Sequence, residues 1–237
     1  MEIGMSLLVC DTSLNLLTTH VLYHSKLVDK IVCVANKPSK LLVHMLRCLE
    51  RGVHNFELID ISYDTMTISL QMQICTKMTI HLKNQGCSWV IPCDDDEFYL
   101  GNIRDNINLA EINGCNVLYQ DGFCFYNTDQ DVEDLNPVRS MVYRDPPAVD
   151  YAFRKAIHKT QDFSKMLSGN HWVEFKIPTT SIKSIDLFIY HYHFRKRKLF
   201  SDIERPPIYL LTKEQIVEKS LIKDEALLEL LDTGGIP

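Results

Sequence analysis

The stretch that decides the fold is Ser88-Trp89-Val90-Ile91-Pro92-Cys93-Asp94-Asp95-Asp96-Glu97-Phe98-Tyr99-Leu100. Its first part, Trp89-Val90-Ile91, has the aromatic and β-branched side chains of a buried strand. Four consecutive acids follow, and they cannot continue into a core because unpaired buried charge is too costly. The acids are therefore expected at the carboxyl end of the strand, in water or on a cation.

A divalent ion is the cation that this spacing favours. Asp94 and Asp96 are two residues apart, so they are predicted to project the same way and to share one ion. Hard oxygen ligands suit Mg²⁺ or Mn²⁺, and such an ion commonly carries the phosphates of a nucleotide. The alternative is a solvated turn or a helix N-terminus, where acids are also favourable.

Upstream of this stretch, strands and helices alternate with short connections. Strands are predicted at 7–10, 31–35, 56–61 and 89–93, and helices after Ser13, after Ser39 and over about 65–83. This order indicates an α/β protein with a mostly parallel central sheet and helices on both faces. Ligands bind at the carboxyl ends of such strands, where four polar residues are predicted to gather: Asp11, Asn36, Asp60 and Asp94.

The second half of the chain is less regular. Strands are predicted at 116–119 and 123–126, joined by a turn at 120–122. Residues 127–150 contain three prolines and are predicted to form a long loop. Further along, Gly169-Asn170-His171-Trp172 predicts a turn that opens a strand, Leu187–Phe194 a strand, and residues 212–232 an acidic amphipathic helix.

The composition is that of one ordinary soluble domain: 237 residues, 46% hydrophobic and 24% charged. The net charge of −6 gives no global attraction to nucleic acid or to an anionic membrane. The eight cysteines are expected to be reduced, buried thiols of a cytosolic protein. No signal peptide or membrane-spanning run is recognised, so a cytoplasmic location without stable membrane insertion is expected.

Together these motifs resemble the small family-two-like glycosyltransferases, which have the GT-A fold. Ser88–Phe98 is similar to the Trp-containing Asp-x-Asp-Glu-Phe block of that family. The family's later motifs follow in the same order: Lys155-Ala156-Ile157, Gly169-Asn170-His171 and His191-Tyr192-His193-Phe194-Arg195. The resemblance runs from about residue 6 to 200. The chain departs from the family at Ala35, where an acid is usual, and at Lys37-Pro38, which replace a flexible glycine turn.

The resemblance implies a single domain with a nucleotide-sugar-binding half (1–100), an acceptor-binding half (101–205) and a C-terminal helical tail (206–237). It implies a metal-dependent hexosyl- or pentosyltransferase that moves a sugar from a nucleotide-diphosphate donor to an acceptor hydroxyl with inversion. Mn²⁺ or Mg²⁺ would be held by Asp94, Asp96 and a late histidine, His191 or, second, His193.

Further residues are expected to hold the two substrates. The donor would contact Asp11, Asn36, Asp60, Asp95, Lys155 and Arg195, the last within the basic run Arg195–Lys198. An acceptor hydroxyl usually needs a general base, for which His171, Asp150 and Glu174 are candidates. The i, i+4 pair His20 and His24 has the spacing of zinc ligands, but packing of a helix against the sheet edge is the favoured explanation.

Several alternatives stay open. The acceptor would be a glycan, a lipid-linked oligosaccharide or a modified DNA base, the last as for some phage-encoded enzymes, which would place the protein in host cytoplasm. A non-catalytic binding module that keeps the fold and has lost the donor site is a different class of function. A nucleotidyltransferase ranks low, because Asp11-Thr12-Ser13-Leu14 lacks the glycines and lysine of a phosphate loop.

Overall fold

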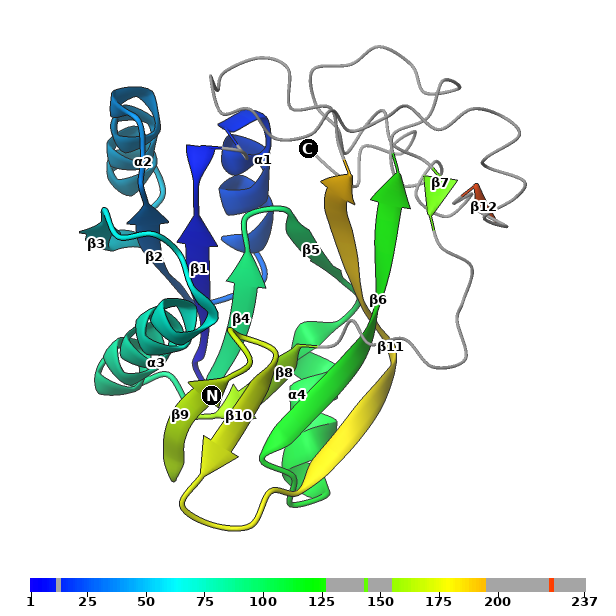
Figure 1. Cartoon of the computed structure of the whole chain (residues 1–237). Coiled ribbons are helices and arrows are strands. Elements are labelled where there is room, and N and C mark those ends of the chain that lie inside the picture. Colours follow the sequence, from blue (N-terminus) through cyan, green and yellow to red (C-terminus); the bar gives the residue numbers. More distant parts are fainter. Residues whose placement is uncertain (12–13, 127–142, 145–154, 195–221, 224–237) are drawn as a thin grey trace.

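A computed structural model describes residues 1–11, 14–126, 143–144, 155–194 and 222–223. Its centre is a parallel set of four strands in the order β3-β2-β1-β4, namely β3 (Phe56–Ser62), β2 (Lys30–Asn36), β1 (Ile3–Val9) and β4 (Trp89–Asp94). The helices α1 (Leu14–His24), α2 (Lys40–Gly52) and α3 (Ile68–Asn84) connect them (Figure 1). The predicted alternation of strands and helices is confirmed.

The helices cover both faces of this sheet. Leucines 14, 17, 42 and 46 of α1 and α2 pack with α4 (Ile103–Ile112) against one face, in the same cluster as Ile3, Met5 and Leu7 of β1. On the other face, Ile74, Met78 and Leu82 of α3 pack against Val32, Val34 and Val90. Because successive strand residues point to opposite faces, an almost uninterrupted apolar strand requires a helix on each side. The predicted α/β architecture is therefore confirmed.

Local capping agrees with the sequence at the second helix. The Ser39 hydroxyl accepts a hydrogen bond of 3.2 Å from the Leu42 N–H, which satisfies one of the free amides of the first turn of α2. Thr67 caps α3 in the same way, so this helix begins slightly later than predicted. The predicted cap Ser13 lies outside the described residues.

Beyond β4 the sheet becomes mixed. It continues through β8 (Ala156–Lys159), β6 (Val117–Tyr126), β7 (Tyr143–Arg144) and β12 (Ile222–Lys223), while β11 (Ser181–Phe194) pairs with both β6 and β5 (Glu97–Leu100). The strands β9 (Phe163–Leu167) and β10 (Trp172–Phe175) form a separate hairpin. The turn at 168–171 and the strand after it are confirmed, and the predicted strand Leu187–Phe194 is the second part of β11.

The predicted turn at 120–122 is wrong. Residues 117–126 form one continuous strand, β6, which runs parallel to β11. Pairing with β11 accounts for Asp121, whose Oδ2 lies 2.7 Å from Lys183 Nζ of that strand. Most of the predicted loop at 127–150 and of the tail 206–237 lies outside the described residues. Within them, Tyr143–Arg144 and Ile222–Lys223 are paired strands, and the latter differs from the helix predicted at 212–232.

One glycine is required by the packing of the β5–α4 turn against β11. Gly101 has φ +110°, and a Cβ atom there would lie 2.2 Å from the Asp186 carbonyl oxygen. We expect Gly101→Ala to lower the free energy of unfolding by about 2–3 kcal/mol, measured by urea unfolding. Gly52→Ala is the matched control, because nothing lies within 4 Å of its Cβ position. If the Gly101 variant were as stable as the Gly52 variant, the close approach of residue 101 to the Asp186 carbonyl would be contradicted.

Candidate functional site

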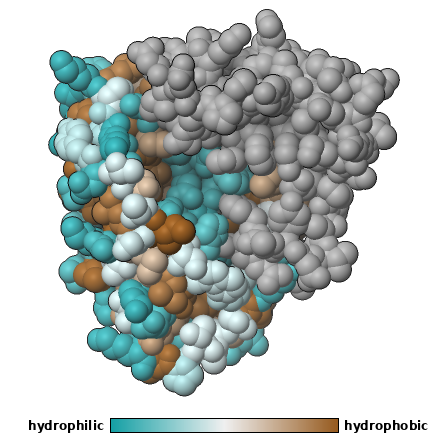
Figure 2. Space-filling view, viewed as in Figure 1, coloured by the Kyte–Doolittle hydropathy of each residue, from teal (hydrophilic) through white to brown (hydrophobic). Residues whose placement is uncertain are grey.

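The four acids lie where the parallel strands end. Asp94 is the last residue of β4, Asp95 and Asp96 form the turn, and Glu97 begins β5. The Glu97 carboxylate folds back and accepts a hydrogen bond of 2.9 Å from the Asp94 N–H, which closes the turn. Figure 2, which is viewed as in Figure 1, shows hydrophilic residues gathered in a hollow near the middle of the molecule.

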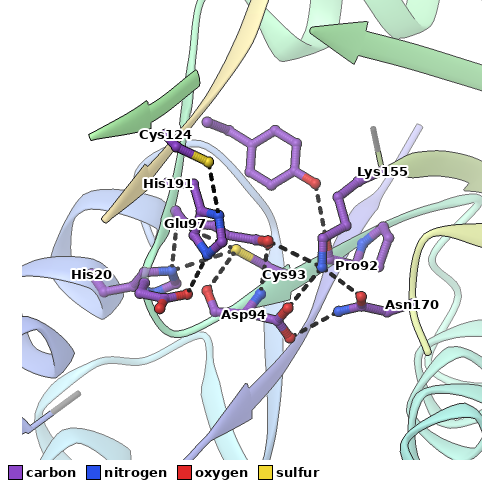
Figure 3. A network of polar contacts seen from close by, with 11 residues as sticks. His20, Pro92, Cys93, Asp94, Glu97, Cys124, Lys155, Asn170 and His191 are labelled. Carbon is purple, nitrogen blue, oxygen red and sulfur yellow. Dashed lines mark hydrogen bonds and ion pairs between the residues drawn. The ribbon is translucent and has the colours of Figure 1, made fainter. Parts of the chain in front are cut away.

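Lys155 provides a buried cation for this turn. Its Nζ atom lies 2.8 Å from Asp94 Oδ2 and 3.1 Å from Glu97 Oε1, and it donates to the Asn170 side-chain oxygen (Figure 3). The Glu97 contact is an ion pair without the alignment of a hydrogen bond. Asn170 in turn donates to Asp94 Oδ1 at 2.9 Å. Two side chains from segments distant in sequence thus fix the Asp94 carboxylate.

The electrostatics of this group follow from burial and charge. Lys155 and Glu97 are fully buried. Burial alone disfavours a charged lysine, but the Asp94 and Glu97 carboxylates outweigh it and raise the pKa of Lys155. Burial raises the pKa of Glu97 to about 7, and the attraction of Lys155 opposes that rise. Lys155 was expected to bind the donor, whereas its ammonium group is directed at protein carboxylates.

Asp96 and His191 form a second pair at the same turn. Asp96 Oδ1 lies 3.3 Å from His191 Nε2, and the Asp96 carbonyl accepts a hydrogen bond of 2.8 Å from the Tyr192 N–H. Strand β11 pairs antiparallel with β5 and places His191 opposite Glu97. This pairing brings His191 next to Asp96. Burial opposes charge on His191, but hydrogen bonding to Asp96 outweighs it and raises the pKa of His191 to about 10.

Asp96 and His191 have the chemistry and the separation of two metal ligands. Two atoms bound to one Mg²⁺ or Mn²⁺ at about 2.1 Å and at right angles lie about 3 Å apart, close to the 3.3 Å between this oxygen and nitrogen. The Asp94 oxygens differ, since each is already hydrogen bonded, one to Lys155 and the other to Asn170. The residues present therefore fit a metal at Asp96 and His191 better than one shared by Asp94 and Asp96.

Among the described residues expected to hold the nucleotide, Asp11, Asn36 and Asp95 lie along the same edge and Asp60 does not. Asp95 accepts a hydrogen bond of 2.8 Å from the Cys10 N–H, and Asp11 accepts from the Ser39 N–H and hydroxyl. The Asn36 amide donates to the Asp64 carbonyl at 3.1 Å. Asp60 lies inside β3 rather than at its end, and its carboxylate bonds the next N–H in the chain.

Two of the three candidate bases lie in described segments, both in the β9–β10 hairpin. His171 lies in the β9–β10 turn, directly after Asn170. Glu174 lies in β10, with its carboxylate 3.4 Å from Lys165 Nζ. Asp150 lies outside the described residues, as do Arg154, the basic run that includes Arg195, and the side chain of His193.

Two parts of the site were not assigned by the sequence analysis. Glu97 was recognised only as one acid of a run, and Asn170 only as part of a turn. The preceding glycine is the feature of the sequence that could have indicated Asn170. Gly169 has φ +74°, and a Cβ atom there would lie 2.6 Å from the Gln71 side-chain oxygen. Gly169 allows the turn to pass close to α3, which places the next residue beside Asp94.

His20 and His24 are buried beneath the turn. His20 Nε2 donates to the Glu97 carbonyl at 2.8 Å, and His24 bonds the His20 carbonyl and the Tyr99 N–H. Cys93 completes a cluster whose ligand atoms lie within 4.8 Å of one another. Because three of the four ring nitrogens of this pair already bond the backbone, the cluster fits the packing explanation better than a zinc site. Burial lowers the pKa of His20 to about 4.

Comparison with known proteins gives limited likenesses. No protein-family model matches the chain. A curated relative, the small ribosomal subunit biogenesis GTPase RsgA of Cytophaga hutchinsonii, is 26% identical over 112 residues, which are 45% of this chain and 35% of RsgA. Among solved structures, TarS 1–349 of S. aureus in complex with UDP has a TM-score of 0.39 at 11% identity and covers 56% of this chain. TarS of S. aureus has a TM-score of 0.45 at 10% identity and covers 83%.

These likenesses do not assign a family. The chain spans 35% of the length of RsgA and 38% of each of these two TarS chains. Identities and TM-scores at this level carry no argument about substrate or activity. Among the helices that the structure describes, none is long and apolar enough to cross a membrane.

Proposed function

We propose that this protein is a metal-dependent glycosyltransferase of the GT-A type, which transfers a sugar from a nucleotide-diphosphate donor to an acceptor hydroxyl. The observation that carries the proposal is the approach of Asp96 and His191 to 3.3 Å at the carboxyl edge of a parallel sheet. Ligands of open α/β sheets bind at this edge. A carboxylate and an imidazole from remote segments are suitable ligands for Mn²⁺ or Mg²⁺.

Each group has a defined part in the proposed reaction. A bound divalent ion would act as a Lewis acid that neutralises the departing diphosphate. Asp96 and His191 would hold that ion, and Lys155 with Asn170 would keep the Asp94 carboxylate in one orientation beside it. Asp11, Asn36 and Asp95 line the edge on which the nucleotide would lie.

The transfer step is proposed to be a single displacement. The acceptor oxygen bonds to the anomeric carbon as the bond from that carbon to the diphosphate oxygen breaks, which inverts the configuration. The hydroxyl proton passes to a general base. His171 is the favoured base among the described candidates, because it directly follows Asn170, whose amide bonds Asp94 of the acidic turn.

A non-catalytic module is the second candidate. The observation that favours it is that both aspartates are paired with cationic side chains, Asp94 with Lys155 and Asp96 with His191. In a protein that has lost the donor site, these cationic side chains would neutralise the aspartates and so stabilise the fold. A module of this kind would bind neither manganese nor a nucleoside diphosphate.

Calorimetry distinguishes the two. We expect UDP or another nucleoside diphosphate to bind the wild-type protein only with Mn²⁺ or Mg²⁺ present. Asp96→Asn is expected to weaken that binding by about 10–100-fold, because it removes a charged ligand. Asp121→Asn is the matched control, since Asp121 pairs with Lys183 in an exposed ion pair of β6 and β11. Nucleotide binding unchanged in Asp96→Asn, or no binding to the wild type, would overturn the proposed function.

A further inference from the structure

The two tryptophans of the chain have opposite environments. Trp89 is fully buried in β4, and its indole N–H donates to Glu111 Oε1 at 2.7 Å. Trp172, the first residue of β10, keeps 45% of its surface exposed. Tryptophan is strongly buried on average, and this half-exposed indole lies two residues after Asn170 of the candidate site.

The exposed indole is held in place by a second ring. Tyr119 of β6 lies with its ring centroid 5.5 Å from that of Trp172, at an interplanar angle of 61°. This edge-to-face arrangement is a favourable geometry for two aromatic rings. Because the backbones of both residues belong to strands, the pair forms a fixed surface rather than a mobile side chain.

Both members of the aromatic pair are tied to the acidic turn. Trp172 follows two residues after Asn170, whose amide bonds Asp94 at 2.9 Å. Tyr119 is the strand partner of Ala156, the residue next to Lys155. Trp172 is therefore linked to the acidic turn through the chain at Asn170, and Tyr119 through the pairing of β6 with β8.

The neighbouring polar groups suit hydroxyls. Along β10, Trp172 and Glu174 are exposed while Val173 and Phe175 are buried, so the indole and this carboxylate share one face. A carboxylate accepts hydrogen bonds from hydroxyls, and the positively polarised C–H face of a pyranose ring stacks on the negative face of an indole. A polyphosphate strand has no global attraction to this chain, whose net charge is −6.

We propose that Trp172 and Tyr119 form the acceptor subsite and bind a pyranose ring of a neutral carbohydrate. The assignment of this ligand as the acceptor rests on the proposed function. The assignment of the ligand as a carbohydrate rests on the two aromatic rings and on Glu174. It selects a glycan over a modified DNA base among the acceptors considered from the sequence.

Tryptophan fluorescence tests the subsite directly, because only one of the two indoles is exposed. The probes are methyl glucoside, methyl galactoside, N-acetylglucosamine, maltotriose and cellotriose at millimolar concentrations, with thymidine monophosphate and a short single-stranded DNA as competitors. We expect at least one saccharide to shift the emission and to protect it from acrylamide quenching. Trp172→Phe removes the exposed indole and is expected to abolish this signal.

Affinities measured by NMR titration complete the test. Trp172→Ala is expected to weaken saccharide binding by about tenfold or more, and Trp172→Tyr by less than about threefold. Ile177→Ala, which truncates another half-exposed apolar side chain, is the control and should bind as the wild type does. The proposal is overturned if no saccharide binds, if Trp172→Ala binds equally well, or if the nucleotide probes bind this indole more tightly than the saccharides.

The outcome is separable from that of the proposed function. Wild-type protein that binds UDP with manganese but no saccharide would overturn the subsite alone. Saccharide binding through Trp172 without any nucleotide binding would keep the subsite and overturn the transferase.

Discussion

Lys155→Met is expected to lower the free energy of unfolding by about 3–5 kcal/mol at neutral pH. The reason is that Asp94 and the fully buried Glu97 lose their shared cation. Methionine keeps the length and apolar stem of lysine, so the loss reports the charge rather than a cavity. Urea unfolding followed by circular dichroism measures the change.

Two further variants assign this loss to the carboxylates. Lys183→Met removes a lysine with the same kind of contact, 2.7 Å to Asp121, but with half of its side chain in water. Such exposed pairs contribute about 0–1 kcal/mol. Adding Glu97→Gln to Lys155→Met is expected to recover part of the stability, because a glutamine amide at this buried position needs neither a cation nor a proton. A loss below about 1 kcal/mol in Lys155→Met would contradict a buried ion pair.

The parallel half of the fold could be predicted from the sequence, because each element there carries its own signal. Apolar β-branched runs mark β1, β2 and β4, and the buried leucine stripe after Ser39 marks α2. The edge that collects Asp11, Asn36 and Asp94 follows from parallel topology alone. Asp60 was misplaced because its strand continues to Ser62, and local pattern does not fix strand ends to one residue.

The second half could not be predicted equally well, because its pairings are non-local. Gln120-Asp121-Gly122 has the composition of a turn, yet pairing with β11 extends the strand through it. No local pattern shows that a strand near residue 190 lies beside it. The same limit applies to the site. Lys155 and Asn170, the partners of Asp94, come from distant segments, and no local pattern shows that they pair with it.

The wild-type protein is expected to lose about 3 kcal/mol of stability between pH 7 and pH 5. Three buried histidines cause the loss. Burial lowers the pKa of His20 and of His158 to about 4, and lowers that of His24 well below its ordinary value of 6.5. The folded state keeps these rings neutral, whereas the unfolded chain takes up a proton on each below pH 6.5. The folded protein is thus fully stable with respect to these histidines above pH 6.5, and it loses this stability as the pH falls toward 4.

The size of the loss follows from the shifts and from two groups that oppose it. Each histidine costs about 2 kcal/mol at pH 5, since one pKa unit corresponds to about 1.4 kcal/mol. Glu97 works in the other direction, because a carboxyl whose pKa is raised to about 7 stabilises the fold as the pH falls below that value. Between pH 7 and pH 5, Glu97 offsets about 2 kcal/mol of the loss caused by the histidines. The raised pKa of His191 offsets a smaller part of that loss.

His158→Gln isolates one member of the group away from the acidic turn. His158 is stacked on Phe163, and its Nδ1 donates to the Ala156 carbonyl at 2.8 Å, a bond that a glutamine amide can replace. Because glutamine does not titrate, the stability difference between pH 7 and pH 5 is expected to shrink by about 2 kcal/mol. His54→Gln, at an exposed histidine, is the control and should keep the wild-type difference. A His158 variant with the wild-type pH dependence would show that His158 is already protonated in the folded protein, and the buried neutral histidine would have to be abandoned.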